Sequence, residues 1–281
     1  SDLANVATKA RLKGDSYRID GQKIWTSMGV IADWCFVLAR TQPGSVGPKG
    51  LSFLLVPMHQ PGVEARPIQQ MTDKAEFAEV YFDGAIASAA DRIGAEGEGW
   101  RASLTTLMNE RSAIGTGGAS GNKPRRGGAA NDAVAVWQRL DESARTPVRR
   151  DELMRLWIRG EVGRLTNLRA AEAAKAGNPG PEMSISKLEF AEFNKQLYSF
   201  CIDLMGADGM VGYDYSFSRP TQLDAMGASR GIQYAFLRVR PNSIEGGTSE
   251  ILRNILGEQV LGLPGEPRVD KDPPWSQVPR S

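Results

Sequence analysis

A pair of glycines followed by two small hydroxyl residues lies near the end of the chain, in the stretch RPNSIEGGTSEILRN at residues 240–254. Gly246 and Gly247 allow backbone N–H groups to approach a ligand closely, because glycine has no side chain and readily adopts positive φ. Glu245 stands directly before them, and a carboxylate in such a place is a candidate general base. The stretch therefore predicts a turn that contacts a ligand. It leaves open whether Glu245 or a carboxylate elsewhere is the base.

The composition argues against several other kinds of site. With 34 Lys and Arg against 33 Asp and Glu, the net charge of +1 disfavours a broad nucleic-acid surface. One histidine, His59, and two separated cysteines, Cys35 and Cys201, do not suggest a metal site. Both cysteines lie in apolar runs, so we expect buried free thiols in a reducing compartment such as the cytoplasm. No apolar run reaches about 18 residues and no signal sequence is visible, so no membrane span is expected.

The first 92 residues have the patterns of short β-strands. Polar and apolar residues alternate in SYRIDGQKIWTS, and Asp20-Gly21 at its centre predicts a two-residue hairpin turn. Further runs rich in aromatic and branched residues follow in DWCFVLAR, GLSFLLVPM and AEVYFDGA. Clusters of Gly and Pro separate these runs. We therefore expect residues 1–92 to form a small β domain, either a barrel or a sandwich.

The apolar spacing becomes helical from Trp100 onward, so residues 93–263 are predicted to form a helical domain. Helices are expected in WRASLTTLMNERSAIG, in ANDAVAVWQRL and in a long segment that Pro147 opens. A further helix is expected in ISKLEFAEFNKQLYSFCIDLMGA. The last segment, residues 264–281, has five prolines in 18 residues and is expected to lie extended on a surface.

The order of several stretches resembles the acyl-CoA dehydrogenase family of flavoproteins. The chain begins SDLA, continues with KGDSYRIDGQKIWTS, GLSFLLVPMHQPGVEARPI and IGAEGEGW, and ends with GGTSEILRNILGEQVLG. The resemblance is specific over residues 1–111 and 241–263 and weaker between them. It implies a multidomain α and β fold, in which a middle β-barrel domain and a C-terminal four-helix bundle follow an N-terminal helical domain. The chain would begin inside the family's GSD segment, so we expect that the N-terminal domain is missing.

The same resemblance implies FAD as the cofactor and an acyl-CoA thioester as the substrate. Trp25 would pack on the flavin, and Ser27 would hydrogen-bond near flavin N5. Ser1 would contact the pantetheine part of the CoA ester. A hydroxyl at N5 and a large aromatic wall suit flavin chemistry, because they orient the ring and exclude water.

Other cofactor contacts are implied closer to the C-terminus. In the family a Gly-Gly turn brings backbone against the adenosine diphosphate half of FAD, and Gly206 matches one glycine of that turn. Thr248 and Glu250 match residues that bind the adenosine or pyrophosphate region. An RxxFG motif that binds the pyrophosphate in many relatives is absent from this sequence. Arg125 and Arg126 could offer charge in its place, although a solvated basic loop is the simpler interpretation.

The position of the base departs from the commonest family pattern. In most relatives a Glu stands immediately before the final GT, and Gly246 occupies that position here. A smaller branch carries its base on a helix of the bundle, just before an Arg, and Glu110 with Arg111 matches that arrangement. We therefore predict Glu110 as the base, with Glu245 as the alternative. The Gly246 N–H would donate to the thioester oxygen, and Arg111 would approach the CoA moiety.

The predicted function is acyl-CoA dehydrogenation in lipid degradation, of the β-oxidation type, with electrons passed to an electron-transfer flavoprotein. Two alternatives remain. The chain could be a non-catalytic subunit of a heteromeric acyl-CoA dehydrogenase, because the usual Glu and the RxxFG motif are both absent. It could also be an acyl-CoA oxidase. Relatives are dimers or larger, so a homo- or hetero-oligomer is expected.

Overall fold

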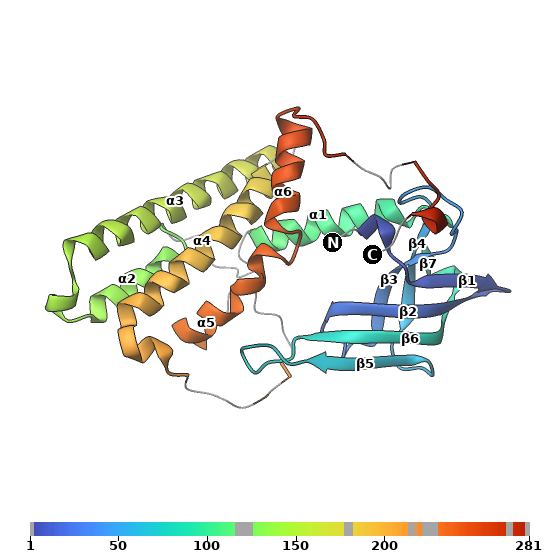
Figure 1. Ribbon diagram of the computed structural model, residues 1–281, viewed down its shortest axis with the longest axis horizontal. Helices are drawn as coiled ribbons and strands as arrows, with labels where there is room; N and C mark the ends of the chain where they lie inside the picture. The colour runs from blue at the N-terminus through green and yellow to red at the C-terminus, as the bar shows by residue number, and fades with distance from the viewer. Residues whose placement is uncertain are drawn as a thin grey trace. The chain divides into compact units, whose positions relative to one another are not determined.

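The structure is a computed structural model that describes residues 3–115, 126–176, 182–212, 217, 219–220, 230–267 and 272–278. The chain folds into two compact units (Figure 1). Unit 1 comprises Ser1–Met108, Phe217–Leu223 and Glu266–Ser281, and unit 2 comprises Asn109–Ser216 and Asp224–Gly265. The strands belong to unit 1 and most of the helices to unit 2. The expected combination of a β domain with a helical domain is therefore confirmed.

Unit 1 is built on a seven-stranded sheet with the strand order β5-β6-β2-β1-β3-β4-β7. Its strands are β1 (Lys9–Lys13), β2 (Ser16–Ser27), β3 (Trp34–Arg40), β4 (Leu51–Pro57), β5 (Val63–Ile68), β6 (Phe77–Ser88) and β7 (Arg92–Ile93). Neighbouring strands are antiparallel except β1 and β3, which pair in parallel between Lys9 and Arg40. The sheet is thus mixed, and its two longest strands, β2 and β6, lie side by side.

The predicted hairpin at Asp20-Gly21 is wrong. Strand β2 runs straight through both residues, and the turn lies between β1 and β2, where Gly14 has φ +61°. Gly21 is needed for a different reason: a Cβ there would lie 2.9 Å from Thr8 Cα. Asp20 accepts a hydrogen bond from the Gly84 N–H at 2.9 Å, which fixes it against β6. The Asp-Gly pair therefore serves a close strand contact and a register shift, not a reversal of the chain.

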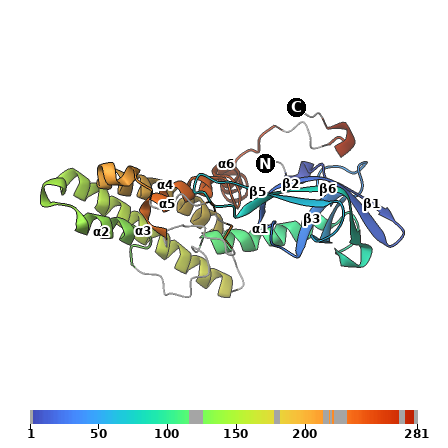
Figure 2. The same ribbon diagram turned by 90° about the horizontal axis from the view of Figure 1, so that it is seen from below.

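One apolar core lies inside the curled sheet. Alternate residues of β2, including Tyr17 and Ile19, point into it, as the period of two predicts. Val37 and Val80, from the non-adjacent strands β3 and β6, belong to the same cluster, so the sheet must curve round to bring them together. Trp100, in the first turn of helix α1 (Gly99–Gly115), packs on a second small cluster of this unit. Figure 2 shows α1 together with the sheet.

Unit 2 is a packed set of helices. Within the described residues, the α-helices are α1 (Gly99–Gly115), α2 (Ala130–Arg139), α3 (Pro147–Lys175), α4 (Glu182–Met205), α5 (Ile232–Arg238) and α6 (Ser249–Asn254). Helix α3 begins at Pro147 as predicted. Leu156 of α3 and Leu197 of α4 lie in the core of the unit. Helix α6 continues as a π-helical segment, Ile255–Val260.

The proline-rich tail returns to unit 1 and is not simply extended on a surface. Trp275 is 4% exposed and lies in a short 3-10 turn, Trp275–Gln277. Its backbone N–H donates to Ser45 O at 2.8 Å, and its indole N–H donates to Asn5 O at 3.4 Å. The Arg40 guanidinium stacks on the indole at 4.9 Å. The aromatic residue thus fixes a segment that its prolines prevent from forming longer regular structure.

No helix among the described residues is long and apolar enough to cross a membrane. Within the same residues, no cluster of His, Cys, Asp and Glu could hold a metal ion. The two cysteines are free: Cys201 is buried, whereas Cys35 is only half-buried. Burial raises the pKa of the Cys201 thiol to about 12, and Asp132 adds to this effect.

Candidate active site

A β-bulge in β2 presents Trp25 to the solvent. Lys23 pairs with Val80 and Thr26 with Ala78, so two residues, Ile24 and Trp25, face a single residue of β6. The bulge breaks the alternation of the strand, and the Trp25 side chain is 59% exposed. One edge of this aromatic side chain meets Phe77, with the ring centroids 6.1 Å apart and the planes at 78°. The bulge therefore keeps the apolar Trp25 ring exposed on the sheet.

The backbone around Trp25 is strained. Trp25 has φ +60° and Met28 has φ +56°, in the left-handed region that disfavours residues with a side chain. The Met28 N–H donates to Glu76 O at 2.8 Å, which holds the second of these residues. Ser27, between them, ends β2 with an exposed side chain. Strain of about 1–3 kcal/mol for each such residue tends to cluster at binding sites, where the surrounding structure maintains it.

The glycine turn of unit 2 adopts the backbone expected for close approach to a ligand. Gly246 has φ +62° and Gly247 has φ +100°. Thr248 follows as the N-cap of α6, and its hydroxyl accepts the Ile251 N–H at 3.2 Å. Because this contact uses an oxygen lone pair, the hydroxyl proton can still be donated to another group.

Lys187 fixes this turn from inside unit 2. Its ammonium donates to Asn242 O at 2.8 Å and to Gly247 O at 2.5 Å, and the side chain is fully buried. One carbonyl precedes the glycine pair and the other belongs to its second glycine, so one ammonium group closes the turn. Burial of a lysine ammonium costs free energy unless its N–H groups are hydrogen-bonded. The buried Lys187 therefore requires the two carbonyl acceptors.

Glu245 points to a buried cation. The Arg238 side chain is 2% exposed, and its Nη1 lies 3.4 Å from Glu245 Oε1. Asn242 Nδ2 donates to the same carboxylate oxygen at 2.6 Å. Both contacts direct the Glu245 carboxylate toward neighbours within unit 2. This arrangement favours a structural role for Glu245.

The predicted residues fall into two groups within the two units. Trp25 and Ser27 lie together on β2 in unit 1. Glu245, Gly246, Thr248 and Glu250 follow one another along the turn of unit 2.

The remaining predicted residues lie outside these two groups. Glu110 has an exposed side chain on α1 and belongs to unit 2. Gly206, with φ +59°, directly follows the end of α4. The Arg111 side chain and Ser1 lie outside the described residues, as does Arg125.

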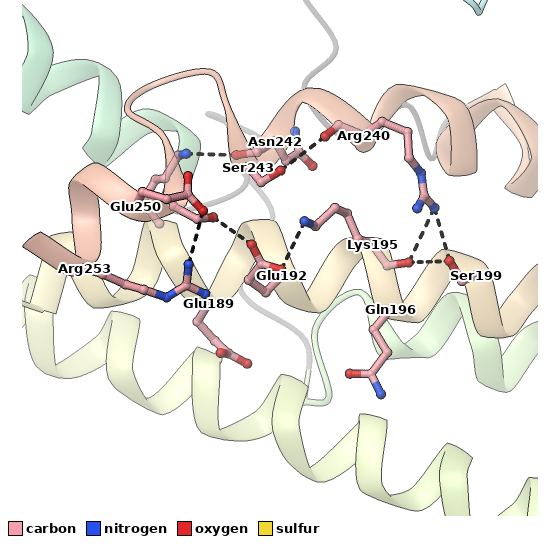
Figure 3. A network of polar contacts seen from close by, with 12 residues as sticks. Glu189, Glu192, Lys195, Gln196, Ser199, Arg240, Asn242, Ser243, Glu250 and Arg253 are labelled. Atoms are coloured by element: carbon pink, nitrogen blue, oxygen red, sulfur yellow. Dashed lines mark hydrogen bonds and ion pairs between the residues drawn. The ribbon is translucent and has the colours of Figure 1, made fainter. Parts of the chain in front are cut away.

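Glu250 makes a contact that the sequence did not suggest. It is exposed and pairs with Arg253 at 3.5 Å, one turn further along the helix. Glu192 of α4 accepts a hydrogen bond from Ser249 Oγ at 2.7 Å and pairs with Lys195 at 3.1 Å (Figure 3). This network ties the start of α6 to α4.

A shallow polar groove of about 730 Å³ lies beside this network. It is lined by Arg159, Glu192, Lys195, Gln196, Ser199, Arg240 and Arg253. The Arg240 guanidinium stacks on Phe236, donates to its carbonyl at 2.8 Å and lies 3.3 Å from Ser199 Oγ (Figure 3). Burial lowers the pKa of Arg240. The other three cations of the groove are paired with Glu189, Glu192 and Glu250, so most of its charge is compensated within unit 2.

Sequence reasoning missed the buried charges behind the turn. Lys187 and Arg238 lie in the stretches SISKLEF and AFLRVR, where a charged residue at a core-facing helical position was the available signal. The carbonyl partners of Lys187, however, are 55 and 60 residues away in the sequence. Local periodicity does not reveal contacts between residues that far apart.

Two family models match almost the whole chain. The acyl-CoA dehydrogenase middle domain matches residues 1–85, and the acyl-CoA dehydrogenase C-terminal domain matches residues 97–261. The chain belongs to the acyl-CoA dehydrogenase family. Its fold class, a β domain followed by helices, is the one that the resemblance implied.

Similar acyl-CoA dehydrogenases are longer than this chain. Acyl-CoA dehydrogenase IpdE1 of Mycobacterium tuberculosis is 41% identical over 95% of the chain, which spans 64% of that protein. Acyl-CoA dehydrogenase FadE34 of the same organism is 33% identical over 94% of the chain and 34% of its own length. Among solved structures, the Tcur3481-Tcur3483 steroid ACAD has a TM-score of 0.77 and 27% identity, covering 94% of this chain and 65% of that one.

Proposed function

We propose that this acyl-CoA dehydrogenase family member takes part in FAD-dependent α,β-dehydrogenation of an acyl-CoA thioester, with electrons passed to an electron-transfer flavoprotein. The observation that carries the proposal is the exposed, strained Trp25 in the β2 bulge. Exposed apolar side chains and strained backbone both tend to occur at interaction sites, and the flat face of Trp25 suits a flat ligand.

The residues present fit a flavin. Trp25 provides an apolar face, and the exposed Ser27 hydroxyl two residues later provides a donor for a ring nitrogen. In unit 2, Thr248 retains a donatable proton and Gly206 leaves backbone accessible. When bound, FAD would accept the β-hydrogen of the substrate, which leaves as hydride.

We assign the base to Glu110. Removal of the α-proton requires a carboxylate that faces the substrate, and Glu245 instead points to Arg238 and Asn242 within unit 2. Glu110 is the carboxylate that the ER pattern of the family places on a helix of the bundle. The Gly246 N–H would donate to the thioester oxygen as negative charge develops on it. Gly246 and Gly247 both have positive φ, a backbone conformation that glycine adopts without strain.

The first prediction tests this assignment by flavin bleaching. The purified chain is expected to carry FAD, whose visible absorbance falls when acyl-CoA is added anaerobically. Glu110→Gln should retain the flavin and slow bleaching by at least about 100-fold, the usual contribution of a general base. Glu245→Gln is the matched control, expected to keep most of the bleaching rate. If Glu245→Gln abolishes bleaching and Glu110→Gln does not, the assignment is wrong.

A non-catalytic subunit is the second candidate function. Two observations favour it: Gly246 stands at the usual base position, and Glu245 is engaged with Arg238. Such a chain would bind a catalytic homologue and show no bleaching alone, but bleaching would appear on adding that homologue and would survive Glu110→Gln. Peroxide release in air at the rate of flavin reoxidation would instead indicate the oxidase.

The similarity to a steroid ACAD directs the search for a substrate. We propose to compare a steroid side-chain CoA thioester with straight-chain acyl-CoA esters of several lengths in the same bleaching assay. We further propose an oligomer of acyl-CoA dehydrogenase subunits. We expect a cytoplasmic location, because the two cysteines are free and free thiols persist in reducing compartments.

A further inference from the structure

The polar groove of unit 2 has room for a small molecule. Its volume of about 730 Å³ lies within the range of about 300–1,000 Å³ that ligand pockets usually have. Four of its lining residues lie on one face of α4, because positions three and four apart on a helix are neighbours. These residues are Glu192, Lys195, Gln196 and Ser199. The rest of the lining is Arg159 of α3, Arg240 before the glycine turn and Arg253 of α6.

The groove contains one positive charge that no carboxylate neutralises. Three of its four cations have carboxylate partners, namely Arg159 with Glu189, Lys195 with Glu192, and Arg253 with Glu250. Arg240, the fourth, makes no ion pair with any described residue and contacts only carbonyls, a hydroxyl and an aromatic ring. A ligand with a single negative charge would therefore balance the groove.

Arg240 is held so that one nitrogen of its guanidinium is left for a ligand. Its Nε donates to Phe236 O at 2.8 Å, and its Nη2 lies 3.3 Å from Ser199 Oγ (Figure 3). The guanidinium also lies over the Phe236 ring at 4.1 Å. Both N–H groups of Nη1 have no acceptor in the described part of the chain. Burial removes part of the hydration of this charge and lowers the pKa of Arg240, so an anion at Nη1 would offset that loss.

Gln196 offers further donors to the same groove. Its Oε1 accepts a hydrogen bond from Arg159 Nη1 at 2.6 Å, which leaves the N–H groups of Nε2 for a ligand. Glu192, the carboxylate of the lining, is engaged through both oxygens, with Ser249 Oγ at 2.7 Å and with Lys195 at 3.1 Å. The groups that remain on Arg240 and Gln196 are therefore both donors.

The charge and the donors together indicate a carboxylate. A carboxylate carries one negative charge and only accepts hydrogen bonds, which matches a guanidinium. A phosphate monoester carries about −1.5 to −2 charges at pH 7 and would exceed the single free positive charge. We propose that the groove binds the carboxylate of a small organic acid, with Arg240 as its anchor and Gln196 as a second donor. This site goes beyond the proposed dehydrogenation and does not depend on a bound flavin.

Titration with sodium acetate at constant ionic strength, followed by backbone amide NMR shifts, tests the site. The wild-type chain should show saturable shifts around residues 192–199 and 240, with a Kd in the millimolar range. Acetamide has a similar shape without the charge and should cause no saturable shift. Absence of saturation with acetate, equal shifts with acetamide, or tighter binding of inorganic phosphate than of acetate would overturn the proposal.

Two substitutions test the donors. Gln196→Glu keeps an acceptor for Arg159 but removes the free N–H groups and adds a negative charge, so it should weaken acetate binding at least about tenfold. Arg240→Gln removes the anchoring charge and should weaken binding by a similar factor. Arg155→Gln is the matched control, because Arg155 is exposed on α3, pairs with Asp151 and lies outside the groove. It should bind acetate like the wild type, and all three variants should keep the helical circular dichroism. Wild-type affinity in Gln196→Glu would overturn the proposal even if Arg240→Gln failed to fold.

A bound acid would also restrain both flanks of the glycine turn. Arg240 opens the 3-10 segment Arg240–Ser243 that leads into the turn, and Glu192 holds Ser249 just after it. The amides of Gly246 and Gly247 should therefore exchange more slowly with solvent in saturating acetate than in chloride at the same ionic strength. Unchanged exchange at these two amides would refute the effect on the turn.

Discussion

The glycine turn depends on charges that are buried beside it. Lys187 holds the carbonyls of Asn242 and Gly247, and Arg238 holds the Glu245 carboxylate. Each charged group is retained because its partners satisfy it, and each would be costly to leave alone. The turn is therefore set in position before any ligand binds, which is what a backbone donor at Gly246 requires.

Replacement of Lys187 by Met should destabilise this turn. The variant fills similar space but leaves two carbonyls without their donor, at a cost of about 1–3 kcal/mol for each unsatisfied group. Urea unfolding should therefore give a clearly lower free energy of unfolding than for the wild type. Lys175→Met, at an exposed position at the end of α3, should change it by less than about 0.5 kcal/mol. Equal stability of the two variants would contradict the role of Lys187.

Strand β2 combines two tasks along its length. Its first half alternates inward and outward residues and anchors the core of unit 1 through Tyr17 and Ile19. Its second half contains the bulge that exposes Trp25. Between them, Lys23 donates to Leu38 O at 2.7 Å. Burial lowers the pKa of Lys23 to about 8, against a smaller opposing effect of Cys35.

Lys23 should give the stability of the protein a particular pH dependence. Its pKa is about 8 in the folded chain and 10.5 for the ordinary group, so between these values the unfolded chain binds more protons. The contribution of Lys23 to stability should therefore rise as the pH increases from about 8 to 10.5, and be least favourable below 8. The stability of Lys23→Met relative to the wild type should fall over this range in urea unfolding. Lys13→Met, exposed at the end of β1, should show no such trend.

At the scale of the whole chain, the tail and the first residues stabilise the same part of unit 1. Trp275 donates to Asn5 O, and Arg40, which stacks on Trp275, donates to Ala4 O at 2.7 Å. The bond between Trp275 and Asn5 joins positions that are 270 residues apart in the sequence. The tail is thus part of the β unit, although it follows the helical one along the chain.

Trp275→Ala should destabilise unit 1. Removal of a buried indole costs about 3–5 kcal/mol, because the site loses apolar contacts and retains a cavity. Thermal unfolding should shift to lower temperature, and the amides of residues 3–6 should exchange faster with solvent. Gln277→Ala, at an exposed position in the same 3-10 turn, is the control and should leave both unchanged. A Trp275→Ala variant that matches this control would show that the tail adds no stability.

The helices were largely predictable because their signals are local. The proline at the start of α3 and the apolar period of α4 depend only on neighbouring residues. The Asp20-Gly21 turn was mispredicted because its local signal is outweighed by pairing with β6 over most of the strand. The roles of Glu110, Trp25 and Ser27 remain predictions that the bleaching assay can test.

The sequence by itself determined the family, the order of a β unit before a helical one and the presence of a glycine turn, since these follow from local patterns and their order. Only the tertiary structure decided that Glu245 faces Arg238, that Lys187 closes the turn and that β2 bulges at Trp25. Each of these depends on which distant side chain or strand comes to lie opposite. No local period encodes such a partner, because folding selects it by packing the whole unit.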